Sequence, residues 1–363
     1  MQKQSCSPVF HIMAKPAGAR CNLSCDYCYY RKMKSLYPKS SFCMSDSIME
    51  RYISQTISAH TIPEVTIAWQ GGEPTLMGID FFTKAVCFQK KAAGTKVKIQ
   101  NTIQTNGVLL DEDWCHFLHE NDFLVGISLD GPRKFHDMFR KDRKGNSVFD
   151  KVTNAVHLMQ KFKVNFNILC TVNSYNCQNP NELYRFFRDD LHANYLQFIP
   201  VVESNNTTGN NQGDFISQRT VPSEAYGNFL IKIFDEWISR DVGTMFIQFF
   251  DGVLSSYLLG QSSLCVLQPT CGHEVVLEHN GDIYSCDHYV QPDYLLGNIK
   301  QSTVAQLVDS EKQRQFGSFK NSSLPQICHK CEFLFTCYGE CPKNRLLQVP
   351  DGSGKLNWLC TGL

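Results

Sequence analysis

Three closely spaced cysteines form the pattern with the clearest chemical meaning in this chain. Cys21, Cys25 and Cys28 follow an apolar run in the spacing C-x3-C-x2-C. Thiolates are soft ligands that suit iron–sulfur clusters or zinc. A four-iron cluster held by only three thiolates keeps one iron open for another molecule. The spacing therefore predicts a metal centre with an open position, against the alternatives of a zinc site or three unrelated thiols.

A second concentration of cysteines lies in the last third of the chain. It comprises eight thiols, enough for two sites of four: Cys265, Cys271, Cys286, Cys328, Cys331, Cys337, Cys341 and Cys360. Spaced C-x2-C pairs are typical of both iron–sulfur sites and zinc ribbons, so spacing alone leaves two four-iron clusters and two zinc ions equally open. Six further cysteines lack ligand spacing and are expected to be small apolar residues: Cys6, Cys43, Cys87, Cys115, Cys170 and Cys177.

Polar and glycine-rich motifs follow several of the expected strands. The sequence QGGEP at 70–74 pairs two glycines, which let a backbone approach a ligand closely, with the carboxylate of Glu73. The sequences QTNG at 104–107 and SLDG at 128–131 end two further strands. Asn-Gly and Asp-Gly are also common turn formers, so each motif is weak alone. Together they predict hydrogen-bonding groups along one rim.

Asp287 directly follows a candidate metal ligand, Cys286. A carboxylate beside a cluster is a candidate general base. The competing interpretation, a solvated or hydrogen-bonded structural aspartate, is the commoner case on sequence alone. The neighbouring His288 is open to the same two interpretations.

The elements that must position these residues alternate regularly. Hydrophobic periodicity predicts strands over 9–15, 65–69, 97–103, 123–129, 164–172 and 195–201, and helices over 45–59, 80–91, 111–120, 149–162, 180–191 and 223–239. Six strands alternating with helices predict an α/β fold whose parallel sheet curls into a partial barrel, with function gathered where strands end. Residues 203–219 read as a long polar loop. We expect a barrel domain over 1–250 and a cysteine-rich domain over 251–363.

Composition limits the partners and the compartment. The 363 residues include 35 basic and 35 acidic side chains, so the broad positive field of a nucleic-acid-binding protein is absent. No apolar run is long enough to span a bilayer, and the first residues do not resemble a signal peptide. We therefore expect a cytoplasmic monomer without nucleic-acid or membrane partners, whose 17 cysteines are ligands or reduced thiols rather than disulfides.

The combined motifs resemble a known family. The cysteine loop at 21–28 and the GGEP motif at 71–74 resemble the radical S-adenosylmethionine enzymes. The later cysteines resemble their SPASM extension, which carries two auxiliary [4Fe-4S] clusters. Within that group, the sequences WQGGEPTL at 69–76, QTNG at 104–107, SLDGP at 128–132 and CDHY at 286–289 resemble the anaerobic sulfatase-maturating enzymes.

This resemblance implies a fold and a set of ligands. It implies a partial (βα)6 TIM-type barrel whose Cys21, Cys25 and Cys28 hold a [4Fe-4S] cluster that binds S-adenosyl-L-methionine through its open iron. The residues that would line the cofactor are Tyr30, Gln70, Gly72, Glu73, Ser128 and Arg140, with Glu73 meeting the ammonium group. The first auxiliary cluster would take Cys265, Cys271, Cys286 and Cys341, and the second Cys328, Cys331, Cys337 and Cys360.

The resemblance also implies a reaction. It is the oxygen-independent conversion of a Cys or Ser of a sulfatase polypeptide to Cα-formylglycine, with Asp287 as the base and a low-potential electron donor such as flavodoxin or ferredoxin. The alternatives are a SPASM-type peptide maturase that forms a thioether or carbon–carbon crosslink, and a zinc-dependent binding module. The chain ends three residues after Cys360, where relatives commonly continue, so the rigidity of Cys360 is a question for the structure.

Overall fold

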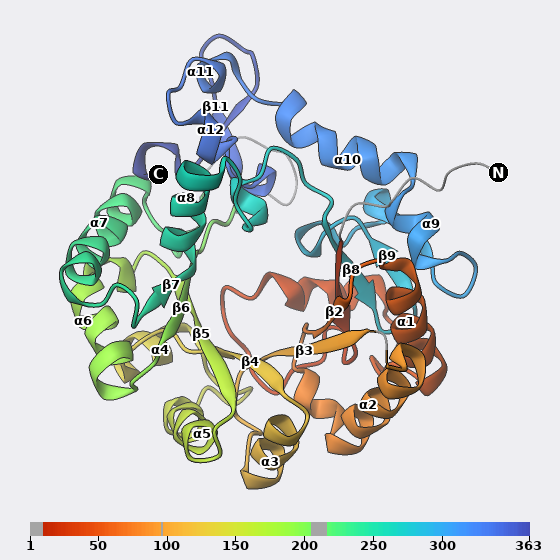
Figure 1. Ribbon diagram of the computed structural model, residues 1–363. Coiled ribbons are helices and arrows are strands. Elements are labelled where there is room, and N and C mark those ends of the chain that lie inside the picture. Colours follow the sequence, from red (N-terminus) through yellow and green to blue (C-terminus); the bar gives the residue numbers. More distant parts are fainter. Residues whose placement is uncertain (1–9, 96, 205–215) are drawn as a thin grey trace.

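A ten-stranded sheet organises the protein, whose computed structural model describes residues 10–95, 97–204 and 216–363 (Figure 1). Its strand order is β10-β9-β8-β1-β2-β3-β4-β5-β6-β7. The first seven strands are β1 (His11–Lys15), β2 (Glu64–Trp69), β3 (Lys98–Thr105), β4 (Phe123–Ser128), β5 (Asn165–Val172), β6 (Tyr195–Pro200) and β7 (Phe246–Ile247). All neighbours among these seven pair in parallel, so their carboxyl ends share one rim.

Helices connect these strands and cover the outside of the curved sheet (Figure 1). They are α1 (Asp46–Ala59), α2 (Ile79–Ala93), α3 (Glu112–Glu120), α4 (Arg133–Phe139), α5 (Phe149–Lys161), α6 (Pro180–Arg185), α7 (Ser223–Arg240) and α8 (Gln248–Leu259). Two helix starts follow from capping: Ser45 accepts a hydrogen bond from Ile48 N, and Asp111 accepts one from Trp114 N. The partial (βα)6 barrel predicted from the sequence is confirmed.

Some predicted boundaries differ from the structure. The helix expected over 180–191 is α-helical only to Arg185 and continues as a π-helical turn, Phe186–Asp190. The two-residue strand β7 and the seven-residue helix α4 were not predicted, because short elements carry too little periodicity. The 12-residue helix α8 was also not predicted, since it falls at the expected domain boundary. Most of the polar loop expected over 203–219 lies outside the described residues.

The cysteine-rich part of the chain extends the barrel sheet. Its strands β8 (Glu274–Glu278), β9 (Asp282–Tyr284) and β10 (Leu295–Asn298) add to the free edge of β1. β8 pairs with β1 in parallel, and Lys15 lies opposite Glu278. Beyond them come α9 (Val304–Val308), α10 (Glu311–Ser322), α11 (Gln326–His329), α12 (Leu334–Cys337) and the hairpin of β11 (Arg345–Gln348) and β12 (Lys355–Asn357). Residues far apart in sequence therefore meet at β1.

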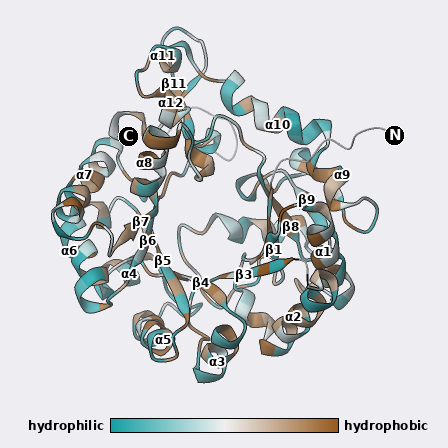
Figure 2. Cartoon of the chain, viewed as in Figure 1, coloured by the Kyte–Doolittle hydropathy of each residue, from teal (hydrophilic) through white to brown (hydrophobic). Residues whose placement is uncertain are grey.

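The core lies between the sheet and its helices. Hydrophobic residues gather along the strands and the helix faces against them, while outer faces such as that of α10 are mostly hydrophilic (Figure 2). On β2, Trp69 is fully buried, and its ring packs edge-on against Tyr52 at 5.4 Å and Phe82 at 5.6 Å. Such offset aromatic packing stabilises beyond the area it buries. This cluster fixes the strand that leads into the QGGEP motif.

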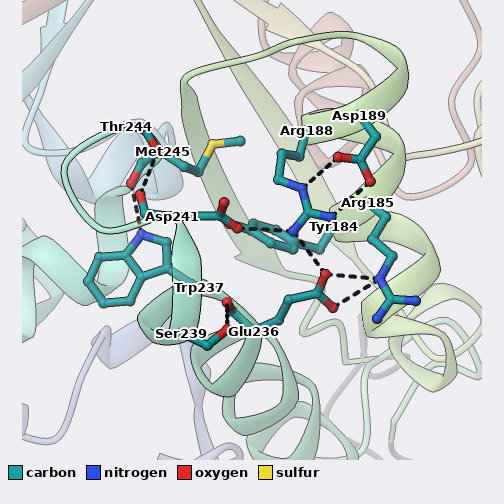
Figure 3. A network of polar contacts seen from close by, with 10 residues as sticks. All are labelled: Tyr184, Arg185, Arg188, Asp189, Glu236, Trp237, Ser239, Asp241, Thr244 and Met245. Atoms are coloured by element: carbon teal, nitrogen blue, oxygen red, sulfur yellow. Dashed lines mark hydrogen bonds and ion pairs between the residues drawn. The ribbon is translucent and has the colours of Figure 1, made fainter.

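An ion-pair network joins α6 and its π-helical turn to α7 (Figure 3). Glu236 accepts hydrogen bonds from Arg185 Nε at 2.9 Å and from Arg188 Nη1 at 2.9 Å. Arg188 also reaches Asp241 at 3.0 Å. The Glu236 side chain is only 7% exposed, so the network is screened poorly by water. It holds together two helices on the far side of the barrel from β1.

In the described part of the chain, no helix combines the length and hydrophobicity needed to cross a bilayer.

Candidate functional site

The three-cysteine loop lies at the carboxyl end of β1. Backbone hydrogen bonds from Ser24 N to Lys141 O (2.9 Å) and from Asp26 N to Phe139 O (3.1 Å) fix it against the segment after α4. Leu23 N donates to Cys21 Sγ at 3.3 Å. The loop is thus held by main-chain contacts on both sides of Cys25.

The three thiols lie close enough to affect one another. Burial raises the pKa of Cys21 to about 11, and the nearby Cys28 adds to this. Burial raises the pKa of Cys25 to about 12, with Arg140 opposing it and Cys28 and Cys21 reinforcing it. Three neighbouring thiols, of which Cys25 is buried and the other two are half-buried, become thiolates together only when a cation compensates them. The iron ions of a cluster meet that requirement, so the donor set fits the predicted [4Fe-4S] group.

The GGEP turn packs against this loop through its backbone. Gly72 has φ +49°, and a Cβ there would lie 2.1 Å from Arg20 O, so the close approach requires glycine. Glu73 N donates to Arg20 O at 2.8 Å. The second glycine of the motif is therefore fixed by sterics.

Glu73 ties the second and third strand ends together. Its buried carboxylate accepts hydrogen bonds from Thr75 Oγ1 at 2.6 Å, Thr105 Oγ1 at 2.7 Å and Asn106 N at 2.8 Å. Burial raises the pKa of Glu73, and these hydrogen bonds oppose that rise. Its described contacts are all with protein groups, so the ammonium contact expected for Glu73 stays a prediction.

The other predicted cofactor-lining residues occupy the same rim or its border. Gln70 N donates to Ala14 O at 2.8 Å, which docks the end of β2 onto β1. Ser128 Oγ accepts a hydrogen bond from Gln104 Nε2 at 3.0 Å at the ends of β4 and β3. The Tyr30 hydroxyl donates to Glu278 of β8. Arg140 is buried and pairs with Asp130. Their contact with a cofactor also stays a prediction.

Asp130 has a larger part than its turn motif suggested. It accepts hydrogen bonds from Thr171 Oγ1 at 2.7 Å, from Arg140 Nε at 2.9 Å and from the Tyr27 hydroxyl within the cysteine loop. Burial alone would raise the pKa of Asp130, but Arg140 and His136 lower it below its usual value. Asp130 therefore links β5, the segment after α4 and the cysteine loop. The SLDG motif predicted the position of Asp130 at a strand end but not this network.

Asp287 lies where the cysteine-rich part meets the barrel. It opens the 3-10 turn Asp287–Tyr289 directly after Cys286. Its Oδ1 is 2.6 Å from Lys15 Nζ, and its Oδ2 accepts a hydrogen bond from the Tyr29 hydroxyl. Burial alone would raise the pKa of Asp287, but the Lys15 ammonium lowers it below its usual value. The carboxylate is thus an ionised acceptor, 13% exposed, beside the three-cysteine loop.

His288 packs against the same tyrosine. Its ring centre is 5.3 Å from that of Tyr29, and its Nδ1 is 3.9 Å from Cys341 Sγ. Burial lowers the pKa of His288 to about 4. The side chain is therefore neutral near neutral pH and adds no positive charge beside Asp287.

The assignment of the eight later cysteines to two cluster sets stays a prediction, but the electrostatic influence among their thiols follows the same grouping. Burial raises the pKa of Cys265, Cys286 and Cys341, and other members of the first set raise it further. Burial likewise raises the pKa of Cys328, Cys337 and Cys360, with further increases from members of the second set. In both sets the influence runs among four thiols drawn from separate segments. The grouping fits two four-iron clusters.

Cys360 is held firmly although it stands near the end of the chain. Its 3-10 turn, Cys360–Gly362, packs against α7, where the C-terminus also lies in Figure 1. Trp358 Nε1 donates to Val221 O at 2.9 Å, and Thr361 Oγ1 to Ser223 Oγ at 2.8 Å. A Cβ at Gly362 would lie 1.9 Å from Ser223 O. The barrel itself therefore positions Cys360, whose role as a cluster ligand stays a prediction.

The other cysteines of the described chain lie as small residues would. Cys115, Cys170 and Cys177 are buried, whereas Cys43 and Cys87 are exposed. Cys6 lies outside the described residues. The sixteen cysteines in the described segments are all free thiols.

Comparison with known proteins matches this geometry. Residues 16–187 match the profile of the Radical SAM superfamily, and residues 269–332 match that of an iron–sulfur cluster-binding domain, SPASM. The fold and the thiol sets thus define a radical S-adenosylmethionine enzyme with a SPASM extension. The predicted iron–sulfur clusters and S-adenosylmethionine are confirmed as the cofactors of this class, and three clusters fit the eleven ligand cysteines.

Similar proteins indicate a family within the radical S-adenosylmethionine enzymes. A serine-type anaerobic sulfatase-maturating enzyme of Bacteroides thetaiotaomicron is 43% identical over 97% of this chain and 87% of its own length. A cysteine-type enzyme of Clostridium perfringens is 36% identical over 97% and 94%. The solved structure of native anSMEcpe with bound AdoMet and Kp18Cys peptide superposes with a TM-score of 0.86 at 36% identity, covering 97% of this chain and 94% of that one.

The chain belongs to the anaerobic sulfatase-maturating enzymes. The predicted fold class, the oxidoreductase class and the conversion of a sulfatase residue to formylglycine are confirmed by this membership. The zinc-dependent binding module is therefore not supported.

Proposed function

We propose that this enzyme uses Asp287 as the proton acceptor when it converts a Ser or Cys side chain of a sulfatase to Cα-formylglycine. The observation that carries the proposal is the Asp287 carboxylate, held by Lys15 and Tyr29 directly after Cys286. It is an ionised group at the junction of the barrel rim and the cysteine-rich part. Such a carboxylate can take a proton from a hydroxyl or thiol placed beside it.

The cofactor site would lie between the three-cysteine loop and the strand ends. Bound S-adenosylmethionine and the cluster supply a 5′-deoxyadenosyl radical, which takes a hydrogen atom from the substrate Cβ. The residues that would hold the cofactor are Tyr30, Gln70, Gly72, Glu73, Ser128 and Arg140. Gly72 supports this placement because its missing side chain lets the turn pack directly against Arg20 O, next to the three-cysteine loop.

The proton step balances the oxidation. The oxidation removes one hydrogen atom, one proton and one electron from the substrate: Asp287 would take the proton, and clusters held by the later cysteines would supply an acceptor for the electron. The oxygen or sulfur then forms a double bond to Cβ, and a thioaldehyde is hydrolysed afterwards. A carboxylate with a lowered pKa is a weak base for a hydroxyl or thiol, so proton transfer must be concerted with loss of the electron.

The two parts of the chain divide this work. We assign residues 1–250 to the barrel that binds cofactor and peptide, and 251–363 to the domain that holds the two auxiliary clusters. The matched ranges 16–187 and 269–332 lie within these bounds. The first cluster set is Cys265, Cys271, Cys286 and Cys341, and the second is Cys328, Cys331, Cys337 and Cys360.

The partners follow from the chemistry. A sulfatase segment with a Cys or Ser would enter the barrel, as the peptide complex of the related enzyme supports. Both serine-type and cysteine-type relatives match, so both residues belong in the assay. We propose a low-potential donor such as flavodoxin or ferredoxin, a monomeric enzyme and a cytoplasmic location, where such donors are available.

The test is anaerobic turnover of two sulfatase-derived peptides that differ only in Ser or Cys. We expect 5′-deoxyadenosine together with a peptide aldehyde, detected by mass spectrometry after hydrazine capture. Asp287→Asn should keep its iron, still form 5′-deoxyadenosine and lose most of the aldehyde. The control Asp150→Asn changes an exposed carboxylate and should behave as the unmodified enzyme.

Two results would redirect the proposal. Oxidised peptide that fails to react with hydrazine would favour the crosslinking alternative. Full aldehyde yield from Asp287→Asn would remove Asp287 as the proton acceptor while leaving the reaction itself in place.

A further inference from the structure

Lys15 is a buried lysine that no motif singled out. It is the last residue of β1, followed by Pro16, and its side chain is 2% exposed. A buried ammonium is costly unless it is paired. Its surroundings should therefore show what it pairs with, and they contain three groups that matter for the reaction.

The first group is Asp287. Lys15 Nζ lies 2.6 Å from Asp287 Oδ1, while the Tyr29 hydroxyl donates to the other oxygen, Oδ2. Each carboxylate oxygen thus has its own partner, one from the end of β1 and one from the residue after Cys28. Two partners on different elements fix both the position and the rotation of a carboxylate.

The other two groups are Tyr30, a predicted cofactor-lining residue, and Gly71, the first glycine of the adjoining turn. Lys15 Nζ lies 4.7 Å from the centre of the Tyr30 ring, within cation–π range. The stem of Lys15 fills the space beside Gly71, because a Cβ on Gly71 would lie 2.0 Å from Lys15 Cδ. One side chain therefore contacts Asp287, Tyr30 and the glycine turn.

We propose that Lys15 is a positioning residue, which fixes the Asp287 carboxylate relative to the cofactor-binding turn so that proton transfer keeps pace with hydrogen-atom abstraction. This inference rests on the proposed role of Asp287. Lys15 touches neither the reacting Cβ nor the proton in this scheme. It acts by joining the proton acceptor to the element that places the radical.

We expect the loss of Lys15 to uncouple S-adenosylmethionine cleavage from oxidation of the substrate, rather than to abolish both. A misplaced general base can cost about 100-fold for an error of about 1 Å, whereas radical formation does not need that base. Without Lys15 the enzyme should still cleave S-adenosylmethionine but complete the oxidation less often. The ratio of aldehyde to 5′-deoxyadenosine measures this directly.

The experiment compares Lys15→Met, which keeps the stem but removes the charge, with Lys15→Arg and with the control Lys84→Met at an exposed ion pair. We expect Lys15→Met to lower the ratio about tenfold or more, with the KM for S-adenosylmethionine changed by less than about threefold. Lys15→Arg should restore part of the ratio, since it restores a cation for Asp287. Lys84→Met should match the unmodified enzyme.

A double variant separates positioning from general damage. Lys15→Met leaves the buried Asp287 carboxylate with the Tyr29 hydroxyl but without its cation, so iron content and thermal unfolding accompany every assay. If Lys15 acts through Asp287, then Lys15→Met combined with Asp287→Asn should form aldehyde within about twofold of Asp287→Asn alone, because coupled residues are not additive. The proposal would be contradicted if the loss of aldehyde formation in the double variant equalled the product of the losses in the two single variants.

The remaining outcomes also test the proposed roles of Lys15 and Asp287. An unchanged ratio in Lys15→Met, alongside a low ratio in Asp287→Asn, overturns the role of Lys15 and keeps that of Asp287. A large rise in KM for S-adenosylmethionine with an unchanged ratio overturns it in favour of a cofactor-binding role through Tyr30 and Gly71. Normal turnover by Asp287→Asn removes the proposed function of Asp287 and with it this inference. Aldehyde from the unmodified enzyme validates the assay in each case.

Discussion

At the scale of single residues, the site depends on backbone positions that only glycine can occupy. Gly72 combines φ +49° with a main-chain oxygen 2.1 Å from where a Cβ would lie. We expect Gly72→Ala to lower the free energy of unfolding by about 3 kcal/mol and to weaken S-adenosylmethionine binding, because the cofactor-binding turn must move. Chemical denaturation and equilibrium binding measure the two effects. Gly94→Ala is the control, since φ there is also positive but nothing lies within 4 Å.

His136 predicts how stability depends on pH. It is fully buried beside the Asp130 network, and burial lowers its pKa to about 4, whereas an unfolded histidine titrates near about 6.5. Below about pH 6.5 this histidine binds a proton in the unfolded chain, whereas His136 in the folded protein stays neutral until the pH approaches about 4. Stability contributed by neutral His136 is therefore present above about pH 6.5 and is lost as pH falls toward about 4. We expect the titration of His136 to lower the free energy of unfolding by about 2 kcal/mol between pH 7 and pH 5.

The measurement is anaerobic denaturant unfolding at both pH values. The variant His136→Gln should show a smaller loss of stability over this range, because glutamine does not titrate. An equal loss in both proteins would mean that other groups control the pH dependence.

At the scale of elements, the network between α6 and α7 should bear on stability alone. Glu236 faces Arg185 and Arg188 (Figure 3), and the helices α6 and α7 lie across the barrel from β2 and β8 (Figure 1). Glu236→Ala would leave Arg188, whose side chain is 15% exposed, without one of its carboxylates. We expect a loss of about 3 kcal/mol and an unchanged aldehyde ratio. Thermal unfolding with parallel turnover assays tests this. Glu182→Ala, in an exposed pair, should cost less than about 1 kcal/mol.

The elements also show what a sequence can predict. The strands β1 to β6 and, apart from α4, the helices up to α7 were predictable because each carries its own hydrophobic period. The rim motifs were predictable because parallel strands end on one side. The parallel pairing of β8 with β1 was not, since nothing local in 274–278 specifies a partner so distant in sequence. The contact of Lys15 with Asp287 depends on that pairing. The sequence therefore predicted a role for Asp287 but none for Lys15.

At the scale of the whole molecule, the cysteine-rich part contacts the barrel on two opposite sides. β8 joins the edge of β1, while the turn at Cys360 docks on α7 across the barrel. The cysteine-rich part is thus attached to the barrel at two places, and its second thiol set includes a ligand positioned by α7. Cluster assembly and barrel folding should therefore depend on each other.

Cys360→Ala tests that dependence. Three four-iron clusters give roughly twelve irons per chain, and removal of one ligand from the second set should reduce this to about eight. Because a bound cluster stabilises only the folded state, the thermal midpoint should fall as well. Iron and sulfide analysis with anaerobic calorimetry measures both. The matched substitution Cys43→Ala, at an exposed thiol outside the sets, should leave iron and midpoint unchanged. A Cys360→Ala protein with full iron would show that its cluster finds another ligand, and that the turn on α7 is packing alone.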